Sequence, residues 1–237
     1  MKILSLNMNM FNYDAVGSFF KYLREINPDI AIIQECRFNR LDGLPTDYNI
    51  LLPNNFSKEK IDNRIHFTLI LCKDKTSQRE DIKELNKFDY SYLKMTNGKS
   101  TLLALHLPYR GDGVEKEFDK LLENIRICDA NIICGDFNAS RKKPNENYNF
   151  MCDLVCNDGY VNLWEFGAKN RLAQIVDYSG EKILAEQDKE YRTYSGNTHI
   201  DYFLAKNDAF ALNSIMIDNR TLAFTDHCGI FVDLNMK

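Results

Sequence analysis

Short apolar runs of strand length recur along the whole chain, and this repetition constrains the fold more than any other feature of the sequence. The runs predicted as strands are residues 2–6, 29–34, 67–72, 100–106, 131–134, 200–205, 214–218 and 229–234. Two longer segments, 15–26 and 115–129, carry apolar residues at helical spacing instead. Strands outnumber helices and do not alternate with them strictly, so the pattern predicts mixed sheets with helices packed on the outside.

The length and composition favour one domain. The 237 residues, of which 44% are hydrophobic, are enough for a full core, and neither a linker nor a low-complexity tract marks a boundary within residues 1–237. The net charge of -4 argues against a protein that holds nucleic acid through a general basic surface. A polyanionic partner would need a local basic patch or bound metal ions.

The cysteines and the N-terminal residues predict a cytoplasmic protein. Residues 1–14 become polar too soon to supply the apolar core of a signal peptide, and no run of about 18 apolar residues predicts a membrane span. The seven cysteines are an odd number, and several lie in apolar runs, as expected of buried thiols in a reducing compartment. Cys152 and Cys156 have no second Cys/His pair at the spacing of a zinc site.

The apolar run at 131–134 is followed by Gly-Asp-Phe-Asn at 135–138. A turn explains this sequence, because Gly, Asp and Asn all favour turns. Alternatively, if the extended geometry continues, Asp136 and Asn138 point the same way and bring a carboxylate and an amide into one small volume. These residues alone favour the turn, so the rest of the chain must decide between the two explanations.

Polar side chains end or interrupt most of the other predicted strands as well. The full set is Asn7, Asn9, Glu35, His106, Asp136, Asn138, Asp201, Asp226 and His227. Each has an ordinary structural explanation, such as a turn, a helix cap or, for Asp201, an ion pair with Arg192. Together they repeat one pattern at the rim of a rigid scaffold, where binding and catalytic groups gather.

Residues of these types, taken together, suit only a few kinds of chemistry. Carboxylates with amides suit a hard divalent cation, which predicts Mg²⁺ or Mn²⁺. Two imidazoles add groups that donate protons or stabilise anions. The sequence has neither a recognisable nucleophile motif nor a Gly-rich loop with Lys-Ser/Thr for a nucleotide. Metal-assisted attack of water on a phosphate ester fits these residues best.

The same residues resemble the endonuclease/exonuclease/phosphatase superfamily, which includes exonuclease III-type and DNase I-like enzymes. The matching motifs are LSLNMN (4–9), IIQE (32–35), LALHLP (103–108), ICGDFN (133–138), HIDYFL (199–204) and TDHCGI (225–230). They follow the order of the family and span nearly the whole chain. The resemblance implies a four-layer α/β sandwich, in which two packed, mostly antiparallel sheets are flanked by helices.

The resemblance also implies a metal site. Glu35 corresponds to the main Mg²⁺ ligand, with Asn7 nearby. Asn9 lies where many relatives have Asp or Asn, and Asp226 corresponds to a second carboxylate on the metal side.

The implied catalytic residues surround this site. Asp136 would orient and deprotonate the attacking water, and Asn138 would hold Asp136 and donate to the phosphate. His227, oriented by Asp201, would donate to a non-bridging oxygen. His106 would stabilise the phosphate or the leaving oxygen. Secreted DNases pair the residue equivalent to His106 with a Glu on the strand matching 65–72, where this chain has no acid.

The loops suggest the substrate. Arg64 lies in one basic loop, and Arg141, Lys142 and Lys143 directly follow the Gly-Asp-Phe-Asn motif, where cations would contact a phosphate backbone. Tyr109 is a candidate for stacking on a base. The leading prediction is a Mg²⁺-dependent phosphodiesterase acting on nucleic acid. The alternatives are a phosphatase or phosphodiesterase for a small metabolite or lipid head group, and an inactive binding module on the same scaffold.

Overall fold

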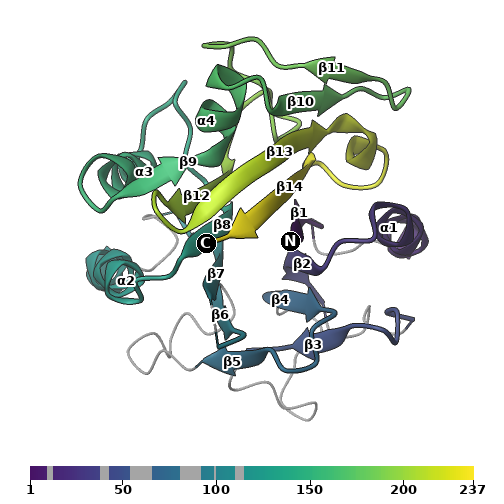
Figure 1. The fold of residues 1–237 in the computed structure, drawn as a ribbon, viewed down its shortest axis with the longest axis horizontal. Coiled ribbons are helices and arrows are strands. Elements are labelled where there is room, and N and C mark those ends of the chain that lie inside the picture. Colours follow the sequence, from purple (N-terminus) through teal and green to yellow (C-terminus); the bar gives the residue numbers. More distant parts are fainter. Residues whose placement is uncertain (10–12, 38–42, 54–65, 81–91, 99, 110–114) are drawn as a thin grey trace.

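The computed structural model describes residues 1–9, 13–37, 43–53, 66–80, 92–98, 100–109 and 115–237. These residues form two sheets (Figure 1). In spatial order, the eight-stranded sheet contains β11 (Lys182–Leu184), β10 (Ala173–Val176), β13 (Phe210–Asp218), β14 (Gly229–Met236), β1 (Lys2–Asn7), β2 (Ile30–Cys36), β4 (Phe67–Cys72) and β3 (Asn49–Leu51). The six-stranded sheet contains β5 (Gln78–Glu80), β6 (Tyr92–Thr96), β7 (Thr101–His106), β8 (Ile132–Asp136), β12 (Asp201–Lys206) and β9 (Tyr160–Asn162).

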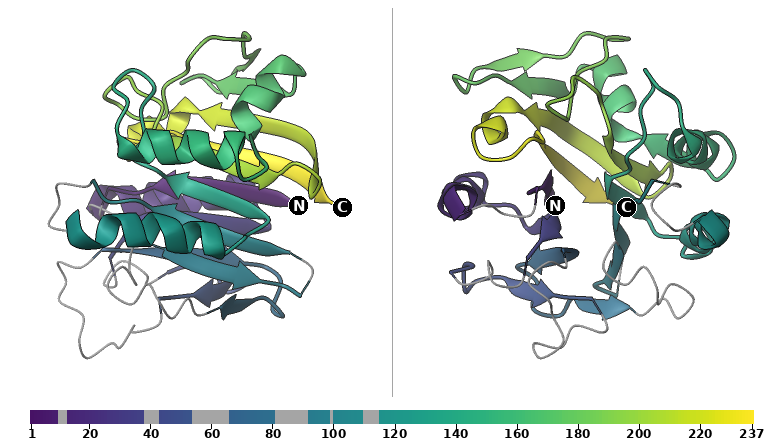
Figure 2. Two further views of the ribbon diagram at one scale, coloured as in Figure 1. Left: turned by 90° about the vertical axis from the view of Figure 1, so that its left-hand side faces the viewer. Right: turned by 180° about the vertical axis from the view of Figure 1, so that it is seen from behind.

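Helices cover the outer faces of both sheets (Figure 2). Helix α1 (Tyr13–Ile26) packs on the eight-stranded sheet, whereas α2 (Glu115–Ile127) and α3 (Glu146–Cys156) lie over the six-stranded sheet. Helix α4 (Leu163–Lys169) contacts β12 of one sheet and β13 of the other, and the 3-10 helix η3 (Asn219–Ala223) precedes β14. No described helix is long and apolar enough to cross a membrane.

Apolar clusters hold the four layers together. The central cluster lies between the sheets and includes Ile3 and Ile32 from one sheet and Ala104 and Ile132 from the other. One further cluster joins α1 to the eight-stranded sheet, and another joins α2 and α3 to the six-stranded sheet. Burying both faces of each sheet explains why the predicted strands are continuous apolar runs rather than alternating patterns.

The structure confirms the predicted sandwich of mostly antiparallel sheets. Among the described strands, the parallel neighbours are β1 with β2, β7 with β8, and β10 with β13. The sequence analysis omitted α3, α4 and several short strands. Strands β5 and β11 have only three residues each and expose most of their side chains, so they carry no apolar signal. Strand β13 begins earlier than predicted, at Phe210, because its first half alternates buried and exposed residues.

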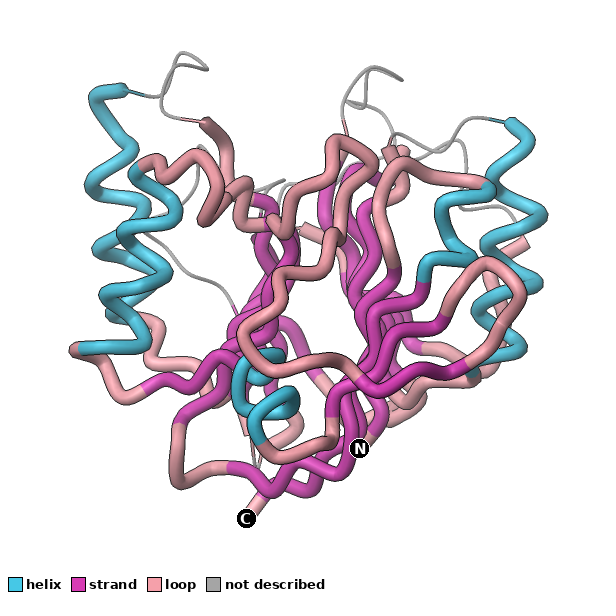
Figure 3. Tube along the Cα trace, turned by 90° about the horizontal axis from the view of Figure 1, so that it is seen from above, coloured by secondary structure: helices cyan, strands magenta, loops and turns pink. Residues whose placement is uncertain are grey.

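The strand directions bring distant residues to one edge of the sandwich. Strands β1, β2, β7 and β8 end there, and β12 and β14, which run antiparallel to β8 and β1, begin there. Both chain termini lie at the opposite end (Figure 3). Polar residues that are far apart in sequence therefore meet at the edge remote from the termini.

Candidate active site

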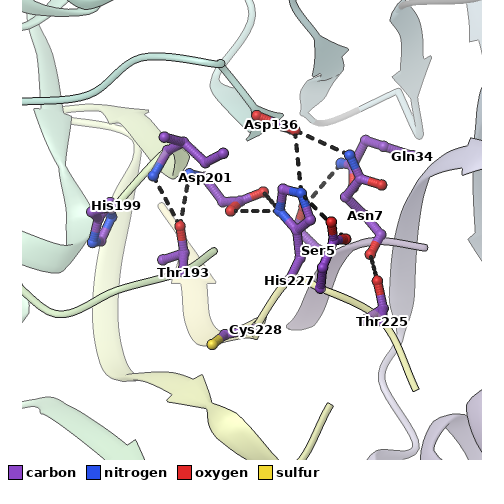
Figure 4. Close-up of polar contacts among 12 residues, drawn as sticks. Ser5, Asn7, Gln34, Asp136, Thr193, His199, Asp201, Thr225, His227 and Cys228 are labelled. Carbon is purple, nitrogen blue, oxygen red and sulfur yellow. Dashed lines mark hydrogen bonds and ion pairs between the residues drawn. The ribbon is translucent and has the colours of Figure 1, made fainter. Parts of the chain in front are cut away.

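Polar residues predicted at the strand ends converge at this edge, and Figure 4 shows four of them: Asn7, Asp136, Asp201 and His227. The Asn7 side-chain nitrogen donates to Glu35 Oε1 at 3.1 Å and to Asp136 Oδ2 at 3.0 Å. His106 Nε2 lies 3.5 Å from Glu35 Oε1 and 3.9 Å from Asp136 Oδ2. His227 Nε2 approaches the same Asp136 oxygen to 3.9 Å from the other side. The two sheets thus share one polar site.

Gly135 permits the close approach of β8 and β7 beneath this site. Its φ of 138° lies in the region that favours glycine, and an added Cβ would stand 2.0 Å from the Leu105 carbonyl oxygen. The same Cβ would meet the Gln34 side chain at 3.0 Å. Any larger residue would push β8 away from its neighbours and displace Asp136.

A β-bulge directs Glu35 toward the site. The register between β2 and β4 shifts between Ile33 and Cys36, and Glu35 has a φ of 53°. Regular alternation would turn this side chain toward the apolar layer under α1, where Ile33 and Cys36 lie. The extra residue re-aims Glu35 to the rim instead. A left-handed Glu costs about 1–3 kcal/mol, a strain that typically marks functional positions.

Asp136 is buried among groups that have opposite effects on its pKa. Its side chain is only 2% exposed. Burial raises the pKa of the carboxyl group, and the charge of Asp201 adds to this effect. His227, His106 and the Asn138 amide lower the pKa. Asp136 is therefore held ready to accept a proton.

His227 and Asp201 form a buried pair. Nδ1 of His227 lies 3.0 Å from Asp201 Oδ2, which leaves Nε2 directed toward Asp136. Burial lowers the pKa of His227, but the carboxylates of Asp201, Asp136 and Asp226 outweigh burial and raise it to about 9. The imidazole is therefore protonated at neutral pH and carries a proton on Nε2.

Two threonines that the sequence analysis did not single out hold this pair in place. Thr193 accepts the backbone N–H of Asp201 on its hydroxyl at 3.1 Å, and its carbonyl accepts the N–H of Cys228 at 2.7 Å. It thus links the strand bearing Asp201 to the segment bearing His227. The Thr225 hydroxyl donates to the Asn7 carbonyl at 2.8 Å and ties that segment to β1.

The site contains groups that fit a divalent cation. Asp226 Oδ1 is buried and has no hydrogen-bond partner among the described residues, and it lies 3.9 Å from His227 Nε2. A buried carboxylate oxygen that accepts no hydrogen bond is a group that a cation would satisfy. Asp136, Asp201 and His227 also offer ligand atoms within 4.8 Å of one another. An ion bound through His227 Nδ1 would break the His227–Asp201 hydrogen bond, and the carboxylates of Glu35 and Asp226 are harder ligands than an imidazole.

The remaining predicted residues lie around the site rather than in it. Asn138, with a φ of 49°, donates its backbone N–H to Asp136 Oδ1 at 2.8 Å, but its side chain donates to the Leu107 carbonyl. Asn9 is exposed and donates its backbone N–H to Asn7 Oδ1. This contact turns the Asn7 nitrogen, rather than its oxygen, toward Glu35.

The predicted substrate-binding residues are exposed where the structure describes them. Lys142 donates to the Asn197 carbonyl at 2.6 Å, and Arg141 and Lys143 lie on either side of it. Tyr109 is 50% exposed. Arg64 lies outside the described residues.

The sequence analysis also missed His66. Its ring centroid lies 6.0 Å from that of His106, next to Glu35. Burial lowers the pKa of His66, and the neighbouring His106 and Arg37 add to this effect, whereas Glu35 opposes it. His66 directly precedes the predicted strand at 67–72, so inspecting that strand end for imidazoles as well as acids would have found it.

Comparison with known proteins agrees with this geometry. The chain matches the Endonuclease/Exonuclease/phosphatase family over residues 4–227, and it belongs to this family. The family consists of phosphoesterases, so the fold and the site define this class of enzyme. No curated protein sequence matches the chain.

Several solved structures are similar to it. The 3′ phosphatase NExo from Neisseria bound to a product DNA hairpin has 13% identity and a TM-score of 0.69, covering 99% of each chain. The human Nocturnin catalytic domain with bound sulfate has 15% identity and a TM-score of 0.64, covering 100% of this chain and 93% of that one. TDP2 from D. rerio with a single-strand DNA product has 16% identity and a TM-score of 0.62, covering 99% and 98%. At such identities these likenesses show a shared fold.

Proposed function

We propose that the protein is a Mg²⁺-dependent phosphodiesterase that hydrolyses nucleic acid. One observation carries the proposal. The buried Asp136 carboxylate accepts a hydrogen bond from Asn7 of the other sheet and lies 3.9 Å from both His106 and the Asp201-paired His227. Such an arrangement places a buried proton acceptor beside two imidazoles, as general acid–base hydrolysis of a charged ester requires.

Glu35 and Asp226 are the residues proposed to hold the metal ion. Their carboxylate oxygens are hard ligands suited to Mg²⁺ or Mn²⁺. When bound, the ion would supply positive charge that stabilises the phosphate as negative charge builds. Asn7 serves this site by donating to Glu35 and so fixing its carboxylate.

The other residues act on protons and on the phosphate. Asp136 orients a water molecule and takes its proton, while the Asn138 backbone N–H holds the second carboxylate oxygen. His227 donates from Nε2 to a non-bridging phosphate oxygen, and Asp201 keeps the imidazole protonated and oriented. His106 stabilises the phosphate or protonates the leaving oxygen.

The choice of nucleic acid rests on the loop cations and on the relatives. Arg141, Lys142 and Lys143 are exposed directly after the Asp136 segment, where a phosphate backbone leaving the site would pass. NExo and TDP2 were both solved with DNA products. The chain's net charge of -4 makes such a local patch more important, because the rest of the surface does not attract polyanions.

A substrate panel tests the proposed function. We expect the protein, with Mg²⁺, to hydrolyse DNA or RNA faster than inositol phosphates or sphingomyelin. Plasmid DNA, single-stranded DNA and RNA are compared with these small substrates and with a minimal phosphodiester.

A triple variant tests the role of the loop cations. Neutralising Arg141, Lys142 and Lys143 together should weaken binding of long nucleic acids. It should also flatten the dependence of the binding constant on salt, because each lost phosphate contact lowers the slope of log K against log salt concentration by about one.

Turnover of the minimal phosphodiester serves as the control in this experiment. It should barely change in the triple variant, because the cations contact the backbone away from the reacting phosphate. Equal losses on both substrates would assign the cations to chemistry or folding. Preference for a small phosphate ester over nucleic acid would refute the proposed substrate and favour the phosphatase alternative.

Replacing Glu35 tests the metal assignment. Glu35→Gln should raise the Mg²⁺ concentration needed for half-maximal activity by about tenfold or more, since even partners outside the ligand sphere change metal affinity by about 10–100-fold. The measurement is activity against metal concentration, together with metal binding by calorimetry. Glu181→Gln, at an exposed carboxylate remote from the site, is the matched control. An unchanged metal requirement in Glu35→Gln would remove Glu35 from the metal site.

A further inference from the structure

A second cavity lies behind the strand that bears Asp201. Its volume is about 510 Å³, within the range of small-molecule sites, and none of the proposed catalytic or metal residues lines it. Adjacent residues of a strand point to opposite faces, so Asp201 faces the site while Tyr202 faces this cavity. Helix α3 contributes Met151 to one wall, and α4 contributes Trp164 to another.

The interior wall of the cavity is aromatic and uncharged. The ring centroids of His199 and Tyr202 lie 4.8 Å apart, and Trp164 lies 6.2 Å from His199. His199 Nδ1 lies 2.8 Å from the Tyr191 carbonyl oxygen, so this nitrogen is the donor. Burial lowers the pKa of His199, which keeps the imidazole neutral. A wall of this kind suits a flat heteroaromatic ring.

One acidic group in the cavity needs a donor. The Oε1 oxygen of Glu190 is buried and has no hydrogen-bond partner among the described residues. Glu190 lines the same cavity as His199 and Tyr202. A buried acceptor without a donor destabilises the folded chain, and a ligand that supplies an N–H would remove that cost.

The rim of the cavity carries charges of both signs. The cations Arg141, Lys169 and Lys189 and the acids Glu165 and Asp188 line it and are exposed. Lys189 is paired with Glu186, so Arg141 and Lys169 are the cations that remain to meet a phosphate. Arg141 is the first of the loop cations that follow Asn138. The cavity thus combines an aromatic interior, an acceptor that lacks a hydrogen-bond donor within the described part of the chain, and the cations Arg141 and Lys169 at its mouth.

We propose that this cavity binds a nucleotide whose base carries an amino group. The base lies against His199 and Tyr202, its amino group donates to Glu190, and its phosphate meets Arg141. Carboxylates accept from exocyclic amino groups in this manner in nucleic-acid recognition. The inference rests on the proposed function, since a nucleic-acid strand or a mononucleotide released from it supplies this chemistry.

Trp164 is the only tryptophan of the chain, so its fluorescence reports occupancy directly. We expect AMP to change the Trp164 emission saturably and to bind more tightly than UMP, which lacks the amino group. Glu190→Met keeps the side-chain length but removes the acceptor, and it should raise the Kd for AMP by about tenfold or more, because hydrogen bonds to charged groups are strong. The preference for AMP over UMP should disappear in the same variant.

Two further variants keep the test decisive. Val155→Phe adds volume to a partly exposed wall position of α3 and should abolish the AMP response even if Glu190→Met folds poorly. Glu181→Met, at an exposed carboxylate outside the cavity, should leave it unchanged. An AMP response that neither Glu190→Met nor Val155→Phe weakens, or equal binding of AMP and UMP, would overturn the inference.

Measurements of hydrolysis with and without AMP show where the nucleotide comes from. They also test the cavity assignment separately from the proposed function. If the cavity holds part of the substrate strand, saturating AMP slows hydrolysis of an oligonucleotide more than that of a minimal phosphodiester. If it holds a free mononucleotide, AMP binds without this selective effect. Hydrolysis without AMP binding would refute the cavity assignment alone, whereas AMP binding without any hydrolysis would refute the proposed function alone.

Discussion

Asp136→Asn should lower kcat by roughly 10²–10⁴-fold, the contribution of a positioned general base. The amide is nearly isosteric but cannot take a proton from water. Oxygen of the new side chain can still accept the Asn138 N–H, so the local backbone should be retained. The measurement is steady-state kinetics on a nucleic-acid substrate, with KM expected to change much less than kcat.

The thermal stability of the Asp136→Asn variant shows whether Asp136 has a catalytic or a structural role. Burial and the Asp201 charge raise the pKa of Asp136, so the folded protein disfavours the ionised carboxylate. Neutral Asn removes that penalty but turns an NH2 group toward the Asn7 donor, so the two effects oppose each other and the metal-free variant should unfold at a temperature close to that of the unmodified protein. Asp208→Asn, at an exposed carboxylate, should change neither activity nor stability. A variant that lost activity and thermal stability together would indicate that Asp136 mainly supports the fold.

The strand ends were predictable because burial and polarity change abruptly there. Ile132 and Ile133 are fully buried in β8; the predicted run stopped at Cys134, two residues before the strand ends at Asp136. The same logic located His106 at the end of β7, whereas Asp201, predicted inside the strand 200–205, is the first residue of β12. Their convergence followed from the resemblance, because the apolar periodicity alone does not order the strands in a sheet.

Contacts between distant segments were not predictable in the same way. Glu35 reaches the site through a bulge and a left-handed backbone, which no propensity of Glu indicates. Thr193 matters because its hydroxyl and carbonyl face two segments that are separate in sequence. His66 becomes relevant only once β4 places it beside His106. The catalytic and metal roles of all these residues stay predictions until variants are measured.

His227→Ala should lower kcat by roughly 10²–10³-fold, the cost of losing one preorganised donor to an oxyanion, with a modest change in KM. The donor acts on charge that grows in the transition state, so it contributes more to turnover than to substrate binding. Asp201→Asn should cost at most as much, because it acts on the phosphate only through the imidazole at 3.0 Å. Steady-state kinetics of both single variants and of the double variant provide the measurement.

The double variant decides whether the two residues work as one unit. Once the imidazole is gone, Asp201 has no proton donor to orient, so the double variant should be little slower than His227→Ala alone. The Thr193 contacts hold the backbone of both segments in every variant, which limits structural differences among them. Losses that multiply would mean that Asp201 acts independently of His227. Asp201 would then serve as a structural carboxylate at the start of β12, and its contribution to kcat would reflect the position of Asp136 opposite it in the sheet.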